Sequence, residues 1–400
     1  MAAPALPGIT IFTRCYPPAY LNGGPARSLH GLVETLAAEF SFSVITSALD
    51  DPAAGPMESV VPDMWSTFGH ARIWYELSGR GWARQAVILL RETRPQVVYL
   101  NSLFDYRFSM MPLLVTRVWL RRIPVLLAPR GELSAGALTL KRRKKRLFLM
   151  IFRLLRLHKT VTWHASTGLE QADIERAFGA GVRTHVAIDL RTGLSCETAG
   201  QDRADYATGT SGGRSLVFMS RIVPKKNVAT LIRALPLVSE RVRLSIAGPI
   251  EDVKYWDQCL ALIGKVTDTD LDSVQYLGTV PAEFVVSFLS RFDLFVLPTL
   301  GENFGHVVLE SLAAGTPVIV GHDTPWHQVE QAGAGWLCNP DDPGDVARLI
   351  QRFISLDKSA RSRMRAAARL VATQVLDAPK GVAANRAMFQ ALTGRPGGPA

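Results

Sequence analysis

The sequence predicts an α/β protein built from doubly wound, parallel-sheet domains. Short apolar runs that suit buried parallel strands alternate along the chain with segments of helical periodicity, which is the pattern of βαβ units. One strand, loop and helix unit opens the chain and another follows at 293–320. With 400 residues, of which 48% are hydrophobic, the chain is long enough to bury the cores of two or three domains.

Composition limits the class of partner and the compartment. The formal net charge of +10 favours anionic partners, which are phosphates, anionic lipid or nucleic acid. The four cysteines are scattered and form no CxxC pair, so we expect a reducing compartment and no disulfide framework. No apolar run approaches eighteen residues, and the first residues lack a basic segment before an apolar one. We therefore expect no transmembrane helix, no signal peptide and a cytoplasmic protein.

The first domain, which we place at residues 1–192, opens with the strand Ile9–Phe12. A loop rich in proline and glycine follows at Arg14–Gly24, and the helix Ala26–Phe40 has apolar residues at helical spacing. The loop is not G-x-G-x-x-G, so a dehydrogenase is poorly supported, and an ordinary βα turn is the alternative to a ligand-binding loop. Further expected elements are strands at Phe42–Thr46, Val97–Leu100, Pro124–Ala128 and Val161–Ala165, and helices at Arg80–Thr93 and Ser109–Arg122.

The loop Ala128–Gly136, with the sequence APRGELSAG, leaves a predicted strand at its carboxyl end. Open α/β sheets bind ligands at that end of their strands. Arg130 and Glu132 are therefore candidates for contacts with an acceptor substrate or a transition state. The alternative is an Arg–Glu ion pair on the surface of the loop.

A basic run followed by an apolar stretch comes next. Six consecutive positive charges at Lys141, Arg142, Arg143, Lys144, Lys145 and Arg146 precede the apolar stretch Leu147–Leu157. Such a segment suits an anionic membrane surface, where each basic residue contributes roughly 1 kcal/mol. The alternatives are a core helix with a solvated basic end and a nucleic-acid site. The basic run has no interleaved aromatic residues, which argues against nucleic acid.

A second domain follows a polar segment. Residues 193–213 are rich in Gly, Ser and Thr and are the expected linker region, before a second domain at 214–375. A helical segment at 376–393 and a disordered tail at 394–400 are expected to end the chain. Further expected elements are strands at Leu216–Met219, Val242–Ala247, Val274–Leu277, Leu294–Leu297 and Val318–Val320, and helices at Ala229–Leu237, Phe304–Ala314 and Asp345–Phe353.

The loop SRIVPKKN, directly after the strand Leu216–Met219, carries two candidate phosphate ligands. Arg221 and Lys226 are five residues apart, so both can reach a diphosphate, and an arginine can bind it through two N–H groups. Lys225 is an alternative to Lys226. Exposed loop charges without a ligand are the other interpretation.

Two glutamates frame the start of the helix expected at Phe304–Ala314. Glu302 lies just before it, and Glu310 lies within it although the helix is apolar nearly all round. A buried carboxylate needs hydrogen-bond donors, and a ligand with hydroxyls could supply them. Free amides at Phe304, Gly305 and His306 would suit an anion. A nucleotide-sugar has the matching diphosphate, sugar hydroxyls and ribose diol.

The segment ENFGHVVLESLAAGTPVIV closely resembles the E-x7-E signature of retaining family 4 glycosyltransferases, also called group 1 glycosyltransferases, which have the GT-B fold. HASTGLEQADIERAFG and TPWHQVEQAGAGWLCNPDDP are similar to further segments of the family, and PRGEL resembles members that build surface polysaccharide. Many relatives have a histidine near the loop that carries PRGEL, and this chain has none there. The resemblance implies two Rossmann-like domains facing a central cleft, with the last helix crossing back to the first domain.

The resemblance also implies the roles of individual residues. In the family the first glutamate contacts the donor sugar, the second binds the ribose, and the amides between them hold the diphosphate. Catalytic roles are thereby implied for Glu302, Arg221 and Lys226. Donor binding is implied for Gly23, Gly24, Arg221, Lys226, Gly248, Gly278, Glu302, Asn303, Phe304, Gly305, His306 and Glu310.

The function that follows is transfer of a sugar from a nucleotide-diphosphate sugar to a lipid-linked saccharide acceptor in polysaccharide biosynthesis. We expect no metal and no other cofactor. Nucleic acid is not an expected partner, whereas an anionic membrane surface is. One alternative is a GT-B sugar-nucleotide epimerase, which needs no acceptor. The other is a non-catalytic membrane- or nucleic-acid-binding protein that keeps the fold, against which the intact set of Arg221, Lys226, Glu302 and Glu310 argues.

Overall fold

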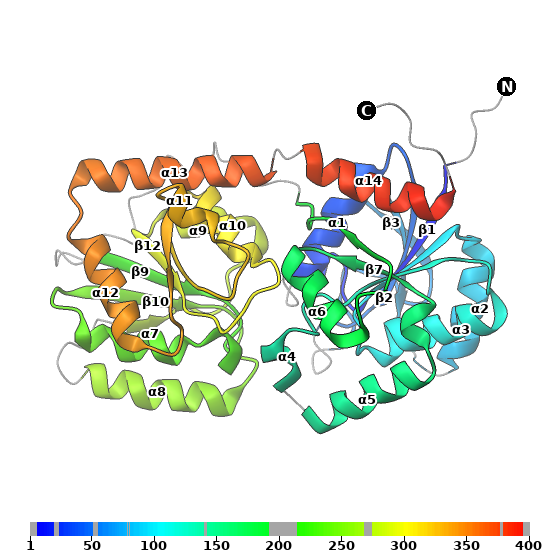
Figure 1. Ribbon diagram of the computed structural model, residues 1–400, viewed down its shortest axis with the longest axis horizontal. Helices are drawn as coiled ribbons and strands as arrows, with labels where there is room; N and C mark the ends of the chain where they lie inside the picture. Colours follow the sequence, from blue (N-terminus) through cyan, green and yellow to red (C-terminus); the bar gives the residue numbers. More distant parts are fainter. Residues whose placement is uncertain are drawn as a thin grey trace. The chain divides into compact units, whose positions relative to one another are not determined.

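The computed structural model describes residues 6–19, 24–50, 55–77, 79, 81–139, 142–191, 214–267, 274–376 and 379–394. The chain divides into two compact units, one formed by Met1–Thr192 with Ala378–Ala400 and the other by Gly193–Asp377. Each unit has a sheet covered by helices (Figure 1). The predicted linker at 193–213 lies outside the described residues, as does the predicted tail apart from its first residue, Gly394.

The first unit is built on an eight-stranded sheet with the order β3-β4-β2-β1-β5-β6-β7-β8. All neighbouring strands run parallel except β3 and β4, which form an antiparallel pair at one edge. That edge pair has no counterpart among the strands predicted from the sequence. The strands are β1 Gly8–Phe12, β2 Ser41–Ser47, β3 Trp65–Phe68, β4 Ala71–Glu76, β5 Val97–Asn101, β6 Val125–Ala128, β7 Thr162–Ala165 and β8 Thr184–Val186.

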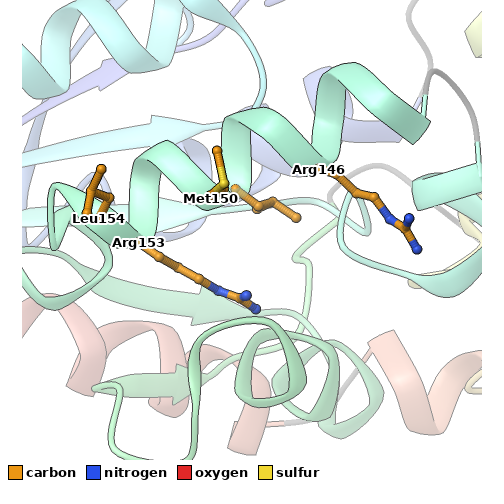
Figure 2. A pocket seen from close by; sticks show the side chains of 5 residues that line it. Arg146, Met150, Arg153 and Leu154 are labelled. Carbon is orange, nitrogen blue, oxygen red and sulfur yellow. The ribbon is translucent and has the colours of Figure 1, made fainter.

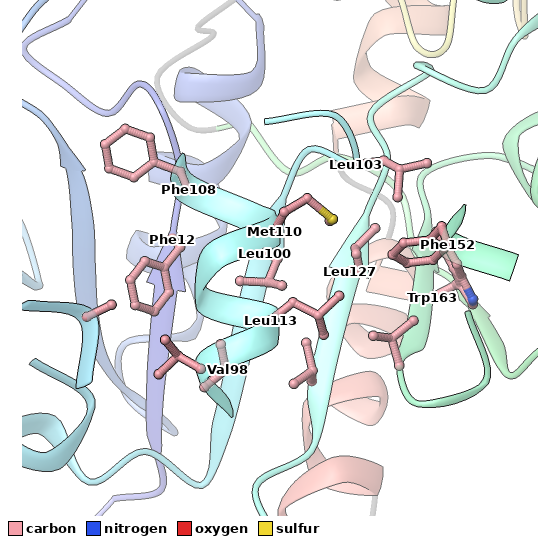
Figure 3. Packing of buried hydrophobic residues seen from close by; sticks show 14 of the residues in the cluster. Phe12, Val98, Leu100, Leu103, Phe108, Met110, Leu113, Leu127, Phe152 and Trp163 are labelled. Carbon is pink, nitrogen blue, oxygen red and sulfur yellow. The ribbon is translucent and has the colours of Figure 1, made fainter. Parts of the chain in front are cut away.

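Helices cover both faces of this sheet because side chains alternate between the faces along each strand. In β1, Ile9 and Ile11 belong to one buried apolar cluster and Phe12 to another. Figure 3 shows the second cluster, in which Leu100 and Leu127 from the strands pack under Leu113. The helices are α1 Gly24–Leu36, α2 Trp82–Thr93, α3 Met111–Trp119, α4 Ala135–Thr139, α5 Arg142–Leu154, α6 Gly168–Phe178 and α14 Pro379–Thr393.

The C-terminal helix α14 is part of the first unit. The ring of Phe389 lies 5.5 Å from that of Phe40 and 5.8 Å from that of Tyr99, between centroids. Asn385 donates a hydrogen bond of 2.9 Å from Nδ2 to the carbonyl oxygen of Ile188. These contacts anchor the last helix on β5 and on the segment that follows β8.

The second unit has a six-stranded, entirely parallel sheet with the order β11-β10-β9-β12-β13-β14. The strands are β9 Arg214–Met219, β10 Val242–Ala247, β11 Val274–Tyr276, β12 Leu294–Leu297, β13 Val318–Gly321 and β14 Gly335–Cys338. The helices are α7 Val228–Ala234, α8 Val253–Thr267, α9 Val285–Ser290, α10 His306–Ala313, α11 Gln328–Gln331, α12 Pro343–Ile354 and α13 Lys358–Leu376. The two Rossmann-like α/β units predicted from the sequence are thus confirmed.

Helix α10 begins two residues later than the sequence predicts. Gly305 is its N-cap residue with φ 78°, a left-handed conformation that excludes Gly305 and Phe304 from the helix. A side chain at this position would also be crowded, because a Cβ on Gly305 would lie 3.1 Å from the indole nitrogen of Trp326. The predicted free amides at Phe304 and Gly305 therefore belong to the loop before the helix and not to its first turn.

Candidate active site

The loops that follow β9 and β12 are bound to each other at the carboxyl edge of the second sheet. The two strands are neighbours in that sheet. The backbone N–H of Leu300 donates to the carbonyl oxygen of Lys225 at 2.9 Å, and the hydroxyl of Thr299 donates to the same oxygen at 3.1 Å. Because ligands bind at the carboxyl ends of strands in open α/β sheets, these loops form a candidate ligand site.

Lys226 and Glu302 form an ion pair across these two loops. The ammonium of Lys226 donates a hydrogen bond to Oε1 of Glu302, and the hydroxyl of Thr299 lies 3.1 Å from the same oxygen. The side chains of Lys226 and Glu302 are 11% and 10% exposed. Burial by itself raises the pKa of Glu302, but the charge and hydrogen bond of Lys226, aided by Lys225 and Thr299, outweigh it and hold the pKa below its ordinary value. The carboxylate is therefore an ionised hydrogen-bond acceptor.

Backbone contacts fix where Glu302 lies. Its N–H donates to the carbonyl oxygen of Asp323, at 3.0 Å. The indole N–H of the buried Trp326 donates to the carbonyl oxygen of Phe304 at 2.5 Å. Both partners follow β13, so the loop before α10 is held between β12 and the segment after the next strand. Trp326 belongs to the segment TPWHQ, which the sequence singled out only by resemblance.

Glu310 lies in α10 and is 3% exposed. Its burial agrees with the burial expected for this helix from the sequence. The predicted contact of this carboxylate with a ribose stays a prediction.

Arg221 shares the loop after β9 with Lys226, but it takes a different partner. Its guanidinium is 50% exposed and pairs with the carboxylate of Glu251 at 3.0 Å and 3.3 Å. Glu251 belongs to the loop after β10, so this arginine lies at the junction of the loops that follow β9 and β10. The structure thus brings Lys226 to Glu302 and Arg221 to Glu251.

Gly248 lets the loops after β9, β10 and β11 approach closely. Its φ is 127°, and a Cβ there would lie only 1.9 Å from the carbonyl oxygen of Ser220. Its N–H donates to the carbonyl oxygen of Gly278 at 2.7 Å, and the hydroxyl of Tyr276 donates to the carbonyl oxygen of Gly248 at 2.8 Å. Two of the predicted donor-site glycines are therefore joined directly by a hydrogen bond.

In the first unit, Arg130 is buried and not on the surface. Its side chain is 9% exposed and forms an ion pair with Asp189, which is 5% exposed. Its guanidinium also donates to Oδ1 of Asn101 at 2.8 Å and to the hydroxyl of Tyr99 at 2.9 Å. These partners come from β5 and from the segment after β8, so Arg130 ties together the carboxyl ends of separated strands.

Glu132 is likewise engaged inside the first unit. Its carboxylate accepts from the N–H of Leu103 at 2.6 Å, the N–H of Phe104 at 3.1 Å and the hydroxyl of Ser102 at 2.8 Å. The alternative of an Arg–Glu surface ion pair is therefore wrong, because each side chain takes its partners from other segments. The proposed acceptor contacts of Arg130 and Glu132 stay predictions, as the interactions found here position the loop itself.

Three of the remaining predicted residues are in or next to segments that the structure does not describe. Gly23 and Lys141 lie outside the described residues, whereas Gly24 is the first residue of α1. In the basic run, Arg142, Arg143, Lys144 and Arg146 are exposed on α5. Lys145 differs, because its ammonium donates to the carbonyl oxygen of Ala137 at 2.7 Å and lies 4.9 Å from the ring centroid of Phe104. The ammonium of Lys145 therefore binds within the first unit.

Among the residues that the structure describes, none of the helices combines the length and the apolar character that spanning a membrane requires. Within the same residues, no group of three or more His, Cys, Asp or Glu side chains is placed to hold a metal ion.

Comparison with known proteins identifies the class of the second unit. Residues 208–371 match the family model described as glycosyl transferases group 1. A D-inositol 3-phosphate glycosyltransferase of Pseudarthrobacter chlorophenolicus is 31% identical over 165 residues, which are 39% of this chain and 38% of that protein. A phosphatidyl-myo-inositol mannosyltransferase of Mycobacterium leprae is 28% identical over 149 residues, 36% of this chain and 37% of that protein. Each match spans well under half of the length of the relative.

Similarity to a solved structure extends over nearly all of the chain. The crystal structure of HepE of Anabaena in complex with UDP-glucose has a TM-score of 0.74 to this chain, with 16% identity, over 97% of this chain and 99% of that one. At this identity the likeness shows the fold alone, and it confirms the predicted GT-B class. The second unit is thus similar to group 1 glycosyltransferases over most of its length. The family resemblance predicted from the E-x7-E segment is therefore confirmed where Glu302 and Glu310 lie.

Proposed function

We propose that this protein is a retaining glycosyltransferase that moves a sugar from a nucleoside-diphosphate sugar to a lipid-linked saccharide acceptor in polysaccharide biosynthesis. The family match of residues 208–371 supports the class of reaction. The UDP-glucose bound by HepE supports a nucleotide-sugar as donor. The name of the Mycobacterium leprae relative, a phosphatidyl-myo-inositol mannosyltransferase, supports a lipid-linked acceptor.

The buried pair of Lys226 and Glu302 carries the proposal. It places a cation and an ionised carboxylate side by side at the carboxyl edge of the sheet, just before α10. The cation suits a diphosphate, and the carboxylate suits the hydroxyls of a sugar. A nucleoside-diphosphate sugar carries both groups on adjacent atoms, so a single ligand would engage both members of the pair.

The reaction breaks the bond between the anomeric carbon and the diphosphate oxygen and forms a bond from an acceptor hydroxyl oxygen to the same carbon. The hydroxyl proton is released, and a nucleoside diphosphate leaves. Negative charge grows on the departing diphosphate, so cations placed beside it lower the barrier. We assign this role to Lys226 and Arg221, and we assign to Glu302 the orientation of the donor sugar. We propose that no metal takes part.

The proposed location is the cytoplasmic side of a membrane that carries the acceptor. Cys259 and Cys338 are buried and form no disulfide, as suits a reducing compartment. The basic run that includes Arg142, Arg143, Lys144 and Arg146 supports approach to an anionic surface.

Calorimetric titration with UDP, GDP and ADP, alone and as sugar conjugates, tests the donor site first. We expect one nucleotide to bind, and Glu310→Gln to weaken that binding. Glu283→Gln serves as the matched control, because Glu283 is exposed in the same unit. If none of the nucleotides binds, or if both variants bind equally well, the proposed donor site is wrong.

Turnover then tests the reaction. We expect Arg221→Ala and Glu302→Ala to lower kcat by about 10²-fold or more, as removal of a charge-stabilising group does in other enzymes. Product analysis with and without a saccharide acceptor separates the alternatives. Conversion of the donor sugar without any acceptor would favour an epimerase and contradict the transferase.

A further inference from the structure

Helix α5 is apolar on two opposite sides. Leu149 and Phe152 face the core and are 9% and 1% exposed. On the other side, residues spaced by three and four positions form a stripe, as expected for one face of a helix. This α5 stripe consists of Leu147, Met150, Ile151 and Leu154, which are 54%, 58%, 44% and 78% exposed. A core helix needs only the first apolar face, so the stripe is unexplained by folding.

Arginines border the α5 stripe. Arg146 and Arg153 extend from the helix beside Met150 and Leu154 (Figure 2). Together with Leu149 these residues line an open pocket of about 570 Å³. Arg153 is held in place, because its Nε donates to the carbonyl oxygen of Ala177 at 2.7 Å. The α5 stripe is therefore bordered by basic side chains, of which Arg153 is fixed by a hydrogen bond.

A second pocket of about 500 Å³ begins where α5 ends, and its lining is strongly basic. Ile123, Pro124 and Thr160 provide the remainder of its surface. No acidic residue lines it, and within the described part of the chain its cations have no ion-pair partner. We call it the basic pocket, and its cations are Arg117, Arg121, Arg122, Arg156, Lys159 and Arg183.

The basic pocket lies at the amino-terminal edge of the first sheet. Pro124 directly precedes β6, and Arg183 directly precedes β8. The loop that carries Arg130 and Glu132 leaves β6 at the opposite edge. Since ligands of open α/β sheets bind at the carboxyl edge, the basic pocket is separate from the part of this unit that faces a substrate.

We propose that the basic pocket and the α5 stripe together form a docking face for a bilayer of anionic phospholipids. The lipid phosphates occupy the basic pocket, and the stripe lies at the level where the acyl chains begin. Trp119, which is 58% exposed at the end of α3 and two residues from Arg117 and Arg121, adds an aromatic side chain of the kind enriched at membrane interfaces. Long basic side chains around an apolar strip are the composition of interfacial helices.

The composition of this face favours a bilayer over the other anionic partner. Proteins that bind single-stranded nucleic acid stack its bases on aromatic side chains, and neither the α5 stripe nor the lining of the basic pocket contains one, which leaves Trp119 beside them. An aliphatic stripe gains nothing from a phosphodiester backbone, whereas it gains from the acyl region of a bilayer. The proposal extends the predicted contact of 141–146 from one end of α5 to its whole outer face and past its last turn.

This inference rests on the proposed function for its purpose, because a lipid-linked acceptor has to be reached at a membrane. The two can fail separately. Bilayer binding needs no donor, and nucleotide binding needs no bilayer, so both are measured on the same preparations of the full chain.

The test is co-sedimentation of the full chain with vesicles of phosphatidylcholine alone and of phosphatidylcholine with phosphatidylglycerol. The pocket variant combines Arg121→Gln, Arg122→Gln and Lys159→Gln. Its control combines Lys254→Gln, Lys265→Gln and Lys358→Gln, which removes the same charge from exposed positions of the second unit. Each basic residue near an anionic surface contributes about fivefold in affinity, so we expect the pocket variant to lower partitioning by roughly tenfold to hundredfold. The control variant should partition like the wild type.

A second pair of variants tests the apolar component. Met150→Ser with Leu154→Ser should weaken binding, whereas Leu237→Ser with Leu370→Ser, at exposed positions of the second unit, should not. Equal losses in the pocket variant and its lysine control would show attraction by net charge alone and would overturn the proposal. So would absence of binding to the anionic vesicles, or release of the protein from them by RNA at constant ionic strength. Intact nucleotide binding in those cases would leave the proposed function standing.

Discussion

Lys226 donates a hydrogen bond to Glu302 across 76 positions of sequence, and both side chains are close to nine-tenths buried. The pair joins the loops after β9 and β12, which neighbour each other in the second sheet. Two charges at such low exposure are stable only because each compensates the other. A donor diphosphate in the proposed site would compete with Glu302 for Lys226, so binding of the donor would loosen this pair.

Removing Lys226 alone should destabilise the second unit more than removing the pair. Lys226→Met leaves the carboxylate of Glu302 buried without its cation, and we expect a loss of about 2–4 kcal/mol in the free energy of unfolding. Lys226→Met combined with Glu302→Gln should recover part of that loss, because no buried charge remains. Urea unfolding of the four members of this mutant cycle measures the coupling. Additive effects of the two changes would contradict the pairing.

Acid should weaken the second unit through Glu302. The pKa of this carboxyl is lower in the folded protein than its ordinary value of 4.5, so the folded state favours the ionised form. The stabilisation is then fully present above pH 4.5 and is lost as the pH falls through the folded value. We expect the unfolding free energy of the wild type to fall more steeply below pH 4.5 than that of Glu302→Gln. Glu283→Gln, at an exposed position of the same unit, should follow the wild type.

Arg130 should matter for the stability of the first unit whatever its role toward a substrate. Glycine suits the left-handed φ of 53° at this position, but Arg130→Gly removes the guanidinium that binds Asp189, Asn101 and Tyr99. We therefore expect a loss of about 2–4 kcal/mol in the free energy of unfolding. Arg130→Lys should recover little, because an ammonium cannot bond all three partners in the plane of a guanidinium. Urea denaturation measures both.

The matched control for Arg130 is Arg94→Gly. Arg94 also has a left-handed φ, of 43°, but it is exposed at the end of α2. The exchange for glycine there changes the backbone in the same way without removing a buried cation. Similar losses at both positions would show that the backbone, and not the buried ion pair, decides the effect.

The second unit was open to prediction because its key features are local in sequence. One short strand, loop and helix segment contains Pro298, the NFG triplet, and Gly315 followed by Pro317. The family match covers that segment. What the sequence did not predict is that Lys226 takes Glu302 as its partner, whereas Arg221 takes Glu251. Pairing between loops depends on the order of strands in the sheet, which no local pattern specifies.

The first unit shows the same limit more strongly. Acceptor contacts were predicted for Arg130 and Glu132, with a surface ion pair as the alternative. Arg130 instead takes Asp189, fifty-nine positions away, as a buried partner. The antiparallel strand β3 also escaped prediction, because its sequence WSTF is only partly buried and shows no apolar run. Gly305, whose left-handed φ delays the start of α10 to His306, also lies against Trp326, which is again a contact between distant segments.

His164 should make the first unit sensitive to pH from the neutral range downward. It is 2% exposed in β7 and bonds on both sides of its ring. Its Nε2 donates to the carbonyl oxygen of Ala187 at 2.8 Å, so Nδ1 accepts from the hydroxyl of Tyr99, at 2.6 Å. Burial, reinforced by the nearby charge of Arg130, lowers the pKa of His164 to about 4 from 6.5. The folded state therefore holds this imidazole neutral, in a structural role.

The sign of the effect follows from the two pKa values of His164. The unfolded chain takes up a proton at 6.5 and the folded chain only at about 4. Stability is then fully present above pH 6.5 and falls by up to about 1.4 kcal/mol per pH unit as the pH drops from 6.5 toward 4. His164→Gln should be less stable at neutral pH but flatter over this range in urea titrations. His327→Gln, at an exposed position of the second unit, serves as the control and should keep the slope of the wild type. An unchanged slope in His164→Gln would show that this imidazole is not held neutral by the fold.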